Sequence, residues 1–178
     1  MEHIERGGAY SRVCDPTWPD PSDTRPSRRT GGRWNPPDRA GRPGFGALYL
    51  NGSLTVAREN ARRSVRARAG VTATLADVAP AALPDLQHYS IAIAEFGDIV
   101  TPAGIAAVGL AATYPVGVLH PPCQAIAEAA YAAGDHGLAV LSAVAAPEEE
   151  LVVFDRDVAA LTTKGAREPF SVWFGPIP

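Results

Sequence analysis

A strand pattern that leads directly into a helix pattern, over residues 46–69, limits the possible folds of this chain more than any other feature. Gly46–Leu50 is a short apolar run, which is typical of a buried strand. Ser53 is a favourable N-cap, and the helix that follows it is expected to reach about Ala69. Apolar residues at helical spacing predict its buried face: Leu54, Ala57, Ala61 and Val65.

The rest of the chain continues to alternate between the two kinds of element. We predict further strands at Val71–Leu75, Ser90–Phe96, Leu138–Leu141, Leu151–Phe154 and Ser171–Phe174. Predicted helices begin at Thr101-Pro102 and at Pro122, and Gly134 ends the second of them. Strands and helices interleave without a regular βαβ rhythm, so we expect a mixed α/β (α+β) fold in one compact domain spanning residues 1–178.

Residues 13–45 show no periodic pattern. They are rich in Pro, Gly, Asp and Arg and are predicted to form loops and turns. An irregular stretch of this length inside a compact domain is often functional.

Composition excludes several classes of protein. Hydrophobic residues make up 46% and charged residues 20% of the chain, which is ordinary globular usage. Residues 1–10 contain Glu2, Glu5 and Arg6 and lack the apolar core of a signal peptide. The most apolar stretch, Ile105–Ala112, is too short to cross a bilayer. We therefore expect a cytoplasmic protein without membrane contact.

The common chemical motifs are absent from the sequence. Cys14 and Cys123 are far apart, so neither a disulfide framework nor a structural zinc site is expected, and we predict no bound metal. No dinucleotide-binding GxGxxG, Walker A, HExxH or nucleophile-elbow pattern occurs. Aromatic residues make up 7% of the chain and do not alternate with basic ones, which disfavours direct nucleic-acid binding.

Charge is distributed unevenly along the chain. Residues 1–70 contain 13 arginines and 7 acidic residues, whereas residues 71–178 contain 3 basic and 12 acidic residues. Arginine binds phosphate or carboxylate through two parallel hydrogen bonds, so an anionic ligand beside the N-terminal part is one interpretation. The other interpretation is that the arginines are solvated surface charges, and it explains most of them without a ligand.

Three blocks of sequence together resemble the RES domain. The first block runs from Gly31-Gly32-Arg33-Trp34-Asn35-Pro36-Pro37 through Ala47-Leu48-Tyr49-Leu50 to Val56-Ala57-Arg58-Glu59. Tyr10-Ser11-Arg12-Val13 resembles the family's opening strand, and Cys123–Ala127 with Gly137–Ala143 resembles its helix–strand–serine segment. Two departures are visible: residues 38–45 are extra length, and the step from Tyr49 to Glu59 is one residue shorter than usual.

The resemblance implies a fold and an activity. RES proteins are toxins of bacterial toxin–antitoxin pairs, with a fold similar to that of ADP-ribosyltransferases, and known members consume NAD⁺. It implies NAD⁺ as the substrate, no cofactor, inorganic phosphate as a candidate co-substrate, an Xre-type antitoxin as partner and a homodimer. The implied site residues are Arg12, Arg33, Tyr49, Glu59 and Ser142.

The chemistry of NAD⁺ cleavage assigns a role to each implied residue. The nicotinamide–ribose bond breaks through an oxocarbenium-like state, which a nearby carboxylate stabilises; Glu59 is the candidate. Arg33 and Arg12 are candidates for binding the pyrophosphate, and Tyr49 for orienting the nicotinamide. Ser142 is expected to hold a ribose hydroxyl or to position Glu59. Water, phosphate or a protein side chain accepts the ADP-ribose.

Each of these residues also has a purely structural interpretation. Glu59 lies about 140° around the helix from the buried face and is within reach of an ion pair with Arg62 or Arg63. Arg33 and Arg12 could be solvated, while Tyr49 and Ser142 could serve only strand packing. Two functional alternatives therefore stay open: an ADP-ribosyltransferase that modifies a protein, and a RES-like module that binds a nucleotide or partner without cleavage.

Overall fold

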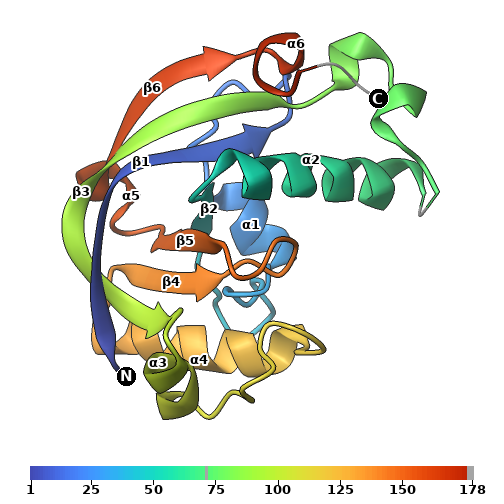
Figure 1. Cartoon of the computed structure of the whole chain (residues 1–178). Coiled ribbons are helices and arrows are strands. Elements are labelled where there is room, and N and C mark those ends of the chain that lie inside the picture. Colours follow the sequence, from blue (N-terminus) through green and yellow to red (C-terminus); the bar gives the residue numbers. More distant parts are fainter. Residues whose placement is uncertain (71, 176–178) are drawn as a thin grey trace.

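A mixed sheet forms the centre of the computed structural model, which describes residues 1–70 and 72–175 (Figure 1). Within those residues the sheet has six strands: β1 (His3–Cys14), β2 (Ala47–Asn51), β3 (Asp85–Ile99), β4 (Gly137–Leu141), β5 (Glu149–Phe154) and β6 (Thr162–Glu168). Their order is β1-β2-β5-β4-β3-β6, and β1 also pairs with β3. Five strands therefore close on one another, and β6 extends from β3.

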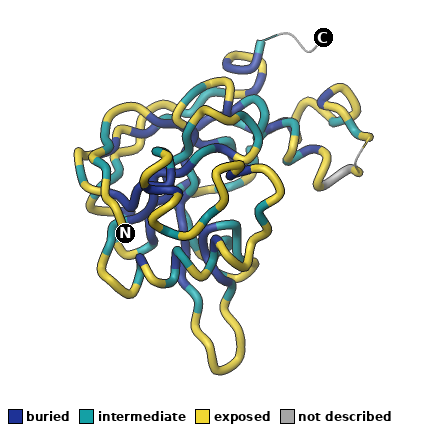
Figure 2. The backbone as a smooth tube through the Cα atoms, turned by 60° about the horizontal axis from the view of Figure 1, so that its bottom comes forward, coloured by how far each residue is buried: buried dark blue, intermediate teal, exposed yellow. Residues whose placement is uncertain are grey.

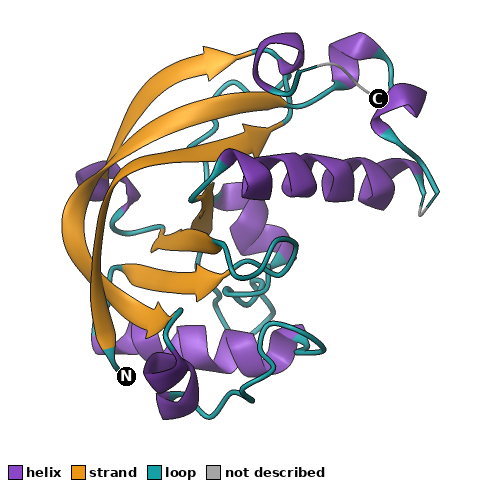
Figure 3. Cartoon of the chain, in the orientation of Figure 1, coloured by secondary structure: helices purple, strands orange, loops and turns teal. Residues whose placement is uncertain are grey.

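The helices gather mostly on one side of the curved strands (Figure 3). They are α1 (Arg25–Thr30), α2 (Leu54–Ala69), α3 (Pro102–Ala107), α4 (His120–Ala133), α5 (Val158–Leu161) and α6 (Phe170–Trp173). Figure 1 shows α2 and α4 at opposite ends of this side, with β2, β5 and β4 between them. No helix within the described residues is both long and apolar enough to span a bilayer.

The three short strands in the middle of the sheet are covered on both faces, and their residues alternate between two cores. One core, which packs against α4, includes Leu138, Val140, Val152, Phe154, Cys123 and Ala127. The other includes Leu48, Leu50, Leu151, Val153, Tyr89 and Phe96. Buried positions accordingly concentrate in the middle of the molecule and exposed ones on its turns (Figure 2). This alternation decides which strand residues reach the site.

Several predicted elements are confirmed. Ser53 caps α2, where its hydroxyl accepts a hydrogen bond from the Val56 N–H at 3.3 Å. Thr101 caps α3 in the same way. Gly134 ends α4 with a φ of 96°, a conformation that favours glycine. The predicted strands within residues 90–96, 138–141 and 151–154 all lie inside observed strands.

Other predictions were wrong. The segment Ser171–Phe174 is helical instead of an edge strand, because the Phe170 and Phe174 rings stack one turn apart and Trp173 donates a hydrogen bond to the Pro84 carbonyl. Of the strand predicted at Val71–Leu75, Val71 lies outside the described residues. Leu75 begins a 3₁₀ turn, Leu75–Asp77, in which the Asp77 carboxylate accepts the Thr74 N–H.

Candidate functional site

A cavity of about 470 Å³ lies where α2 meets the sheet and the loop after α1. Strand β1 contributes Arg12 to its wall, and the loop contributes Arg33 and Trp34. Tyr49 and Asn51 come from β2 and Glu150 from β5; the remaining polar lining includes Asn60, Arg63 and Ser64 of α2 and His120 of α4. Small-molecule sites typically enclose roughly 300–1,000 Å³, so the cavity has the size of a ligand site.

The loop turn that carries Arg33 is fixed by Tyr49. The Tyr49 hydroxyl accepts a hydrogen bond from the Trp34 N–H at 2.9 Å and donates one to Asn35 Oδ1 at 2.8 Å. Glycine is required at Gly32 because a Cβ there would lie 2.4 Å from the Tyr49 hydroxyl. Burial raises the pKa of Tyr49, so the phenol stays protonated and able to donate.

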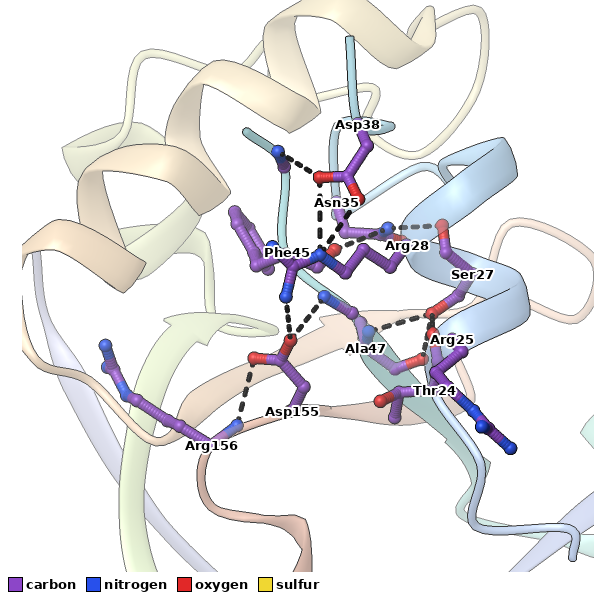
Figure 4. Close-up of polar contacts among 12 residues, drawn as sticks. Thr24, Arg25, Ser27, Arg28, Asn35, Asp38, Phe45, Ala47, Asp155 and Arg156 are labelled. Atoms are coloured by element: carbon purple, nitrogen blue, oxygen red, sulfur yellow. Dashed lines mark hydrogen bonds and ion pairs between the residues drawn. The ribbon is translucent and has the colours of Figure 1, made fainter. Parts of the chain in front are cut away.

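Contacts on the far side of the loop hold it against β2 and β5 (Figure 4). Asn35 is fully buried and donates hydrogen bonds to the carbonyls of Ser27 and Phe45. Asp155 accepts the Gly46 N–H at 2.8 Å and lies 3.8 Å from Arg28, which also pairs with Asp38. The irregular segment is therefore a structured wall of the cavity, and it includes the short helix α1, which the sequence did not predict.

Arg12 is a buried cation at the cavity wall. The residue is 9% exposed; its guanidinium donates to the Pro21 carbonyl at 2.7 Å and lies 5.2 Å from the centre of the Trp18 ring. Burial lowers its pKa. A buried positive charge at the cavity wall favours an anionic ligand.

Further cations make the cavity electropositive. Arg33 donates to the Val118 carbonyl at 2.8 Å, and Arg63 lines the opposite wall from α2. Desolvation, followed by the charges of Arg33 and Arg63, lowers the pKa of His120, so its imidazole is neutral at neutral pH. Three guanidinium groups thus face the carboxylates of Asp15 and Glu150 in one cavity.

Glu150 is held by donors from two other elements. The Asn60 amide nitrogen and the Ser142 hydroxyl both donate to Oε1 of Glu150, at 2.9 and 3.1 Å. The same Asn60 nitrogen lies 2.8 Å from Asn51 Oδ1, and Asn51 in turn donates to the Ser11 carbonyl. A polar network therefore runs from β1 through β2 and α2 to β5, along one side of the cavity.

Glu59 lies outside this network, which corrects the sequence-based placement. Its carboxylate pairs with Arg62, one turn along α2, and its side chain is 37% exposed. The next residue, Asn60, faces the cavity, because consecutive helix positions differ by about 100°. The one-residue shortening between Tyr49 and Glu59 thus has a structural consequence: an amide occupies the wall where a carboxylate was expected.

The structure brings Arg12, Arg33 and Tyr49 together in the cavity wall. It places Ser142, fully buried, behind the wall as a partner of Glu150, and it separates Glu59 from all of these. Sequence reasoning missed Asn60, Arg63, His120 and Glu150. A period-2 extension of the predicted strand Leu151–Phe154 by one residue would have placed Glu150 on the face of Val152 and Phe154.

Metal-binding residues do not gather at this site: no group of three or more His, Cys, Asp or Glu side chains in the described residues is arranged to hold an ion. Cys123 is a buried free thiol, and burial raises its pKa.

Comparison with known proteins identifies relatives of the chain. Residues 9–173 match the family described as the RES domain. The chain is also similar to a solved structure, the crystal structure of the M. tuberculosis MbcT–MbcA toxin–antitoxin complex. The TM-score is 0.76 at 24% sequence identity, over 97% of this chain and 90% of the other, so the fold is shared. A search of curated proteins gave no match.

Proposed function

Because the chain belongs to the RES-domain family, we propose that it is the toxin of a toxin–antitoxin pair and that it cleaves the nicotinamide–ribose bond of NAD⁺. One observation carries this proposal. A single cavity joins three guanidinium groups to a carboxylate that two hydrogen bonds hold in place.

The cationic wall suits the pyrophosphate of a dinucleotide. Arg12 and Arg33 present planar groups that can each bind a phosphate through two hydrogen bonds, and Arg63 adds a third positive charge. Arg12 is already desolvated, so its attraction for an anion is screened less than that of a surface arginine.

The chain's own groups suffice for the reaction. Nicotinamide leaves as a neutral molecule, so bond breaking requires no general acid. The positive charge that develops on the ribose is stabilised by a carboxylate in a partly enclosed site. Water or inorganic phosphate then takes up the ADP-ribosyl group, giving ADP-ribose or its 1″-phosphate.

A second candidate is nucleotide binding without cleavage. The observation that favours it is the position of Glu59, whose carboxylate pairs with Arg62 outside the cavity. If Glu59 were the required carboxylate, the cavity would bind a dinucleotide but not cleave it.

Product analysis separates these functions. Purified protein is incubated with NAD⁺, with and without phosphate, and the products are identified by chromatography and mass spectrometry. The proposal predicts free nicotinamide together with ADP-ribose or its phosphate. ADP-ribose attached to a protein would indicate a transferase, and binding of NAD⁺ with no turnover would indicate a binding module.

Partners follow from the proposed toxin role. We expect a cognate antitoxin, an Xre-type protein, that covers the cavity and so blocks NAD⁺ entry; the MbcT–MbcA complex pairs a toxin of this fold with an antitoxin. A homodimer remains a prediction, which sedimentation equilibrium of the purified chain would test.

A further inference from the structure

We propose that Glu150, not Glu59, is the catalytic carboxylate of this chain. The inference rests on the proposed NAD⁺ cleavage and assigns its central role to a residue of β5, whereas the sequence resemblance assigns it to α2.

Strand geometry directs Glu150 toward the cavity. In β5 it lies on the same face as Val152 and Phe154, because residues two apart in a strand share a face. Val152 and Phe154 pack in the core that contains α4. Its register partners are Asn51 in β2 and Val140 in β4, and Val152 pairs with Tyr49. Glu150 is therefore one register step from Tyr49 on the same face, at the end of the sheet that opens into the cavity.

The hydrogen bonds of Glu150 fix one oxygen and leave the other available. Asn60 and Ser142 both donate to Oε1, and within the described part of the chain Oε2 has no hydrogen-bond partner. The Asn60 nitrogen must point this way because it also serves Asn51 Oδ1. A carboxylate oriented at one oxygen and free at the other can contact a ribose in the cavity.

Asn60 explains how the catalytic carboxylate can come from β5 in this chain and not from α2. The α2 residue that lies against Glu150 in the cavity wall, Asn60, is an amide, which carries no charge to stabilise a cation. As a hydrogen-bond donor, however, it orients the carboxylate that reaches the same place from β5. Asn60 and Ser142 are positioning residues under this assignment, and Glu150 is the group that touches the substrate.

The proposed step balances without further groups. The bond between ribose C1″ and the nicotinamide nitrogen breaks, and its electron pair goes to nicotinamide, which leaves neutral. The resulting positive charge on the ribose faces Glu150 Oε2. Water adds to C1″ and releases a proton to solvent, or inorganic phosphate adds through one of its oxygens.

Three glutamine variants test the assignment. Glu150→Gln keeps the size of the side chain and removes its charge, while Glu59→Gln does the same at the position implied by the resemblance. Glu148→Gln is the matched control, because Glu148 is exposed and lies two residues from Glu150 in the sequence. For each protein, NAD⁺ turnover, the Kd of ADP-ribose and the thermal unfolding curve are measured.

We expect Glu150→Gln to lower kcat by about 100-fold or more, the size of effect seen when a transition-state electrostatic contact is removed. Its Kd for ADP-ribose should stay within about 3-fold of wild type, because ground-state binding depends on the arginines. Glu59→Gln and Glu148→Gln should both turn over NAD⁺ at close to the wild-type rate. If Glu150→Gln fails to fold, Glu150→Asp replaces it and should lower kcat without loss of ADP-ribose binding.

The outcomes distinguish the two proposals. A wild-type chain that binds NAD⁺ without cleaving it overturns the proposed function and this assignment together. A wild-type chain that cleaves NAD⁺, with Glu150→Gln equally active or Glu59→Gln inactive, leaves the proposed function standing and overturns the assignment to Glu150 alone.

Discussion

The Tyr49 hydroxyl lies 2.8 Å from Asn35 Oδ1, so a strand residue directly holds the turn that presents Arg33 to the cavity. The same hydroxyl accepts the Trp34 N–H, and it is therefore used on both its donor and its acceptor side. Tyr49 had been predicted to orient the nicotinamide. Its two hydrogen bonds instead show a structural role: Tyr49 connects β2 with the loop that carries Arg33.

Removal of this hydroxyl should loosen the turn. In Tyr49→Phe, the Trp34 N–H and the side-chain oxygen Oδ1 of Asn35 lose their partner, which costs about 1–3 kcal/mol of unfolding free energy. We expect KM for NAD⁺ to rise more than kcat falls, because Arg33 loses its fixed position. Tyr114→Phe is the control: it also loses one buried hydrogen bond, to the Leu141 carbonyl, but Tyr114 does not line the cavity. Equal effects of both variants on KM would contradict this role of Tyr49.

Gly32 packs tightly against the Tyr49 side chain of β2. Gly32→Ala would place a methyl group 2.4 Å from the Tyr49 hydroxyl and 2.8 Å from Asn35 Oδ1, so the turn must shift. We expect about a 10-fold or greater loss of affinity for ADP-ribose, measured by calorimetry, since a shift of this kind removes at least one forked arginine contact. Gly165→Ala in β6, where the nearest atom is 3.4 Å away, should bind normally.

The contacts of Asp155 should contribute to stability and, through the loop, to binding. Asp155→Ala leaves the Gly46 N–H without its acceptor and removes a partner of Arg28, with an expected loss of about 1–3 kcal/mol in chemical denaturation. Glu128→Ala breaks the exposed pair with Arg42 on the same loop and should cost less than about 1 kcal/mol. A larger effect of the second variant would argue against the anchoring role of Asp155.

The pKa of His120 predicts a pH dependence of folding. Desolvation, Arg33 and Arg63 hold this pKa below its ordinary value of 6.5 in the folded chain. Between the folded and unfolded pKa values the unfolded chain binds more protons, so stability falls as the pH is lowered through and below 6.5. His120→Gln should reduce this slope, as measured by urea denaturation from pH 7.5 to 5. An identical slope in both proteins would contradict the prediction.

Helices and strands could be predicted where residues close in the sequence determine their limits. The limits of α2 and α4 followed from Ser53 and Gly134, whose caps act within one turn. The segment Ser171–Phe174 contains the strand-favouring residues Val, Trp and Phe, yet the stacking of Phe170 on Phe174 and the contact of Trp173 with Pro84 made it helical. Such long-range contacts are invisible to a periodicity argument.

The site was predictable only where the family resemblance fixed the register. Arg12, Arg33 and Tyr49 could be named in advance because their neighbours in the sequence carry the RES pattern. Glu150 could not, since its importance arises from pairing with Asn60 and Ser142, 90 and 8 residues away. The resemblance placed Glu59 in the site. Because the step from Tyr49 to Glu59 is one residue shorter than usual, Glu59 instead lies outside the cavity and pairs with Arg62.

We expect a dinucleotide to occupy the arginine-lined cavity with its reactive ribose beside Glu150. A crystal structure of Glu150→Gln soaked with NAD⁺ tests it most directly, because the variant should bind the intact substrate. The pyrophosphate should lie against Arg12 and Arg33, and the nicotinamide ribose should lie within hydrogen-bond distance of residue 150. NAD⁺ bound elsewhere, or with its nicotinamide ribose at Glu59, would contradict it.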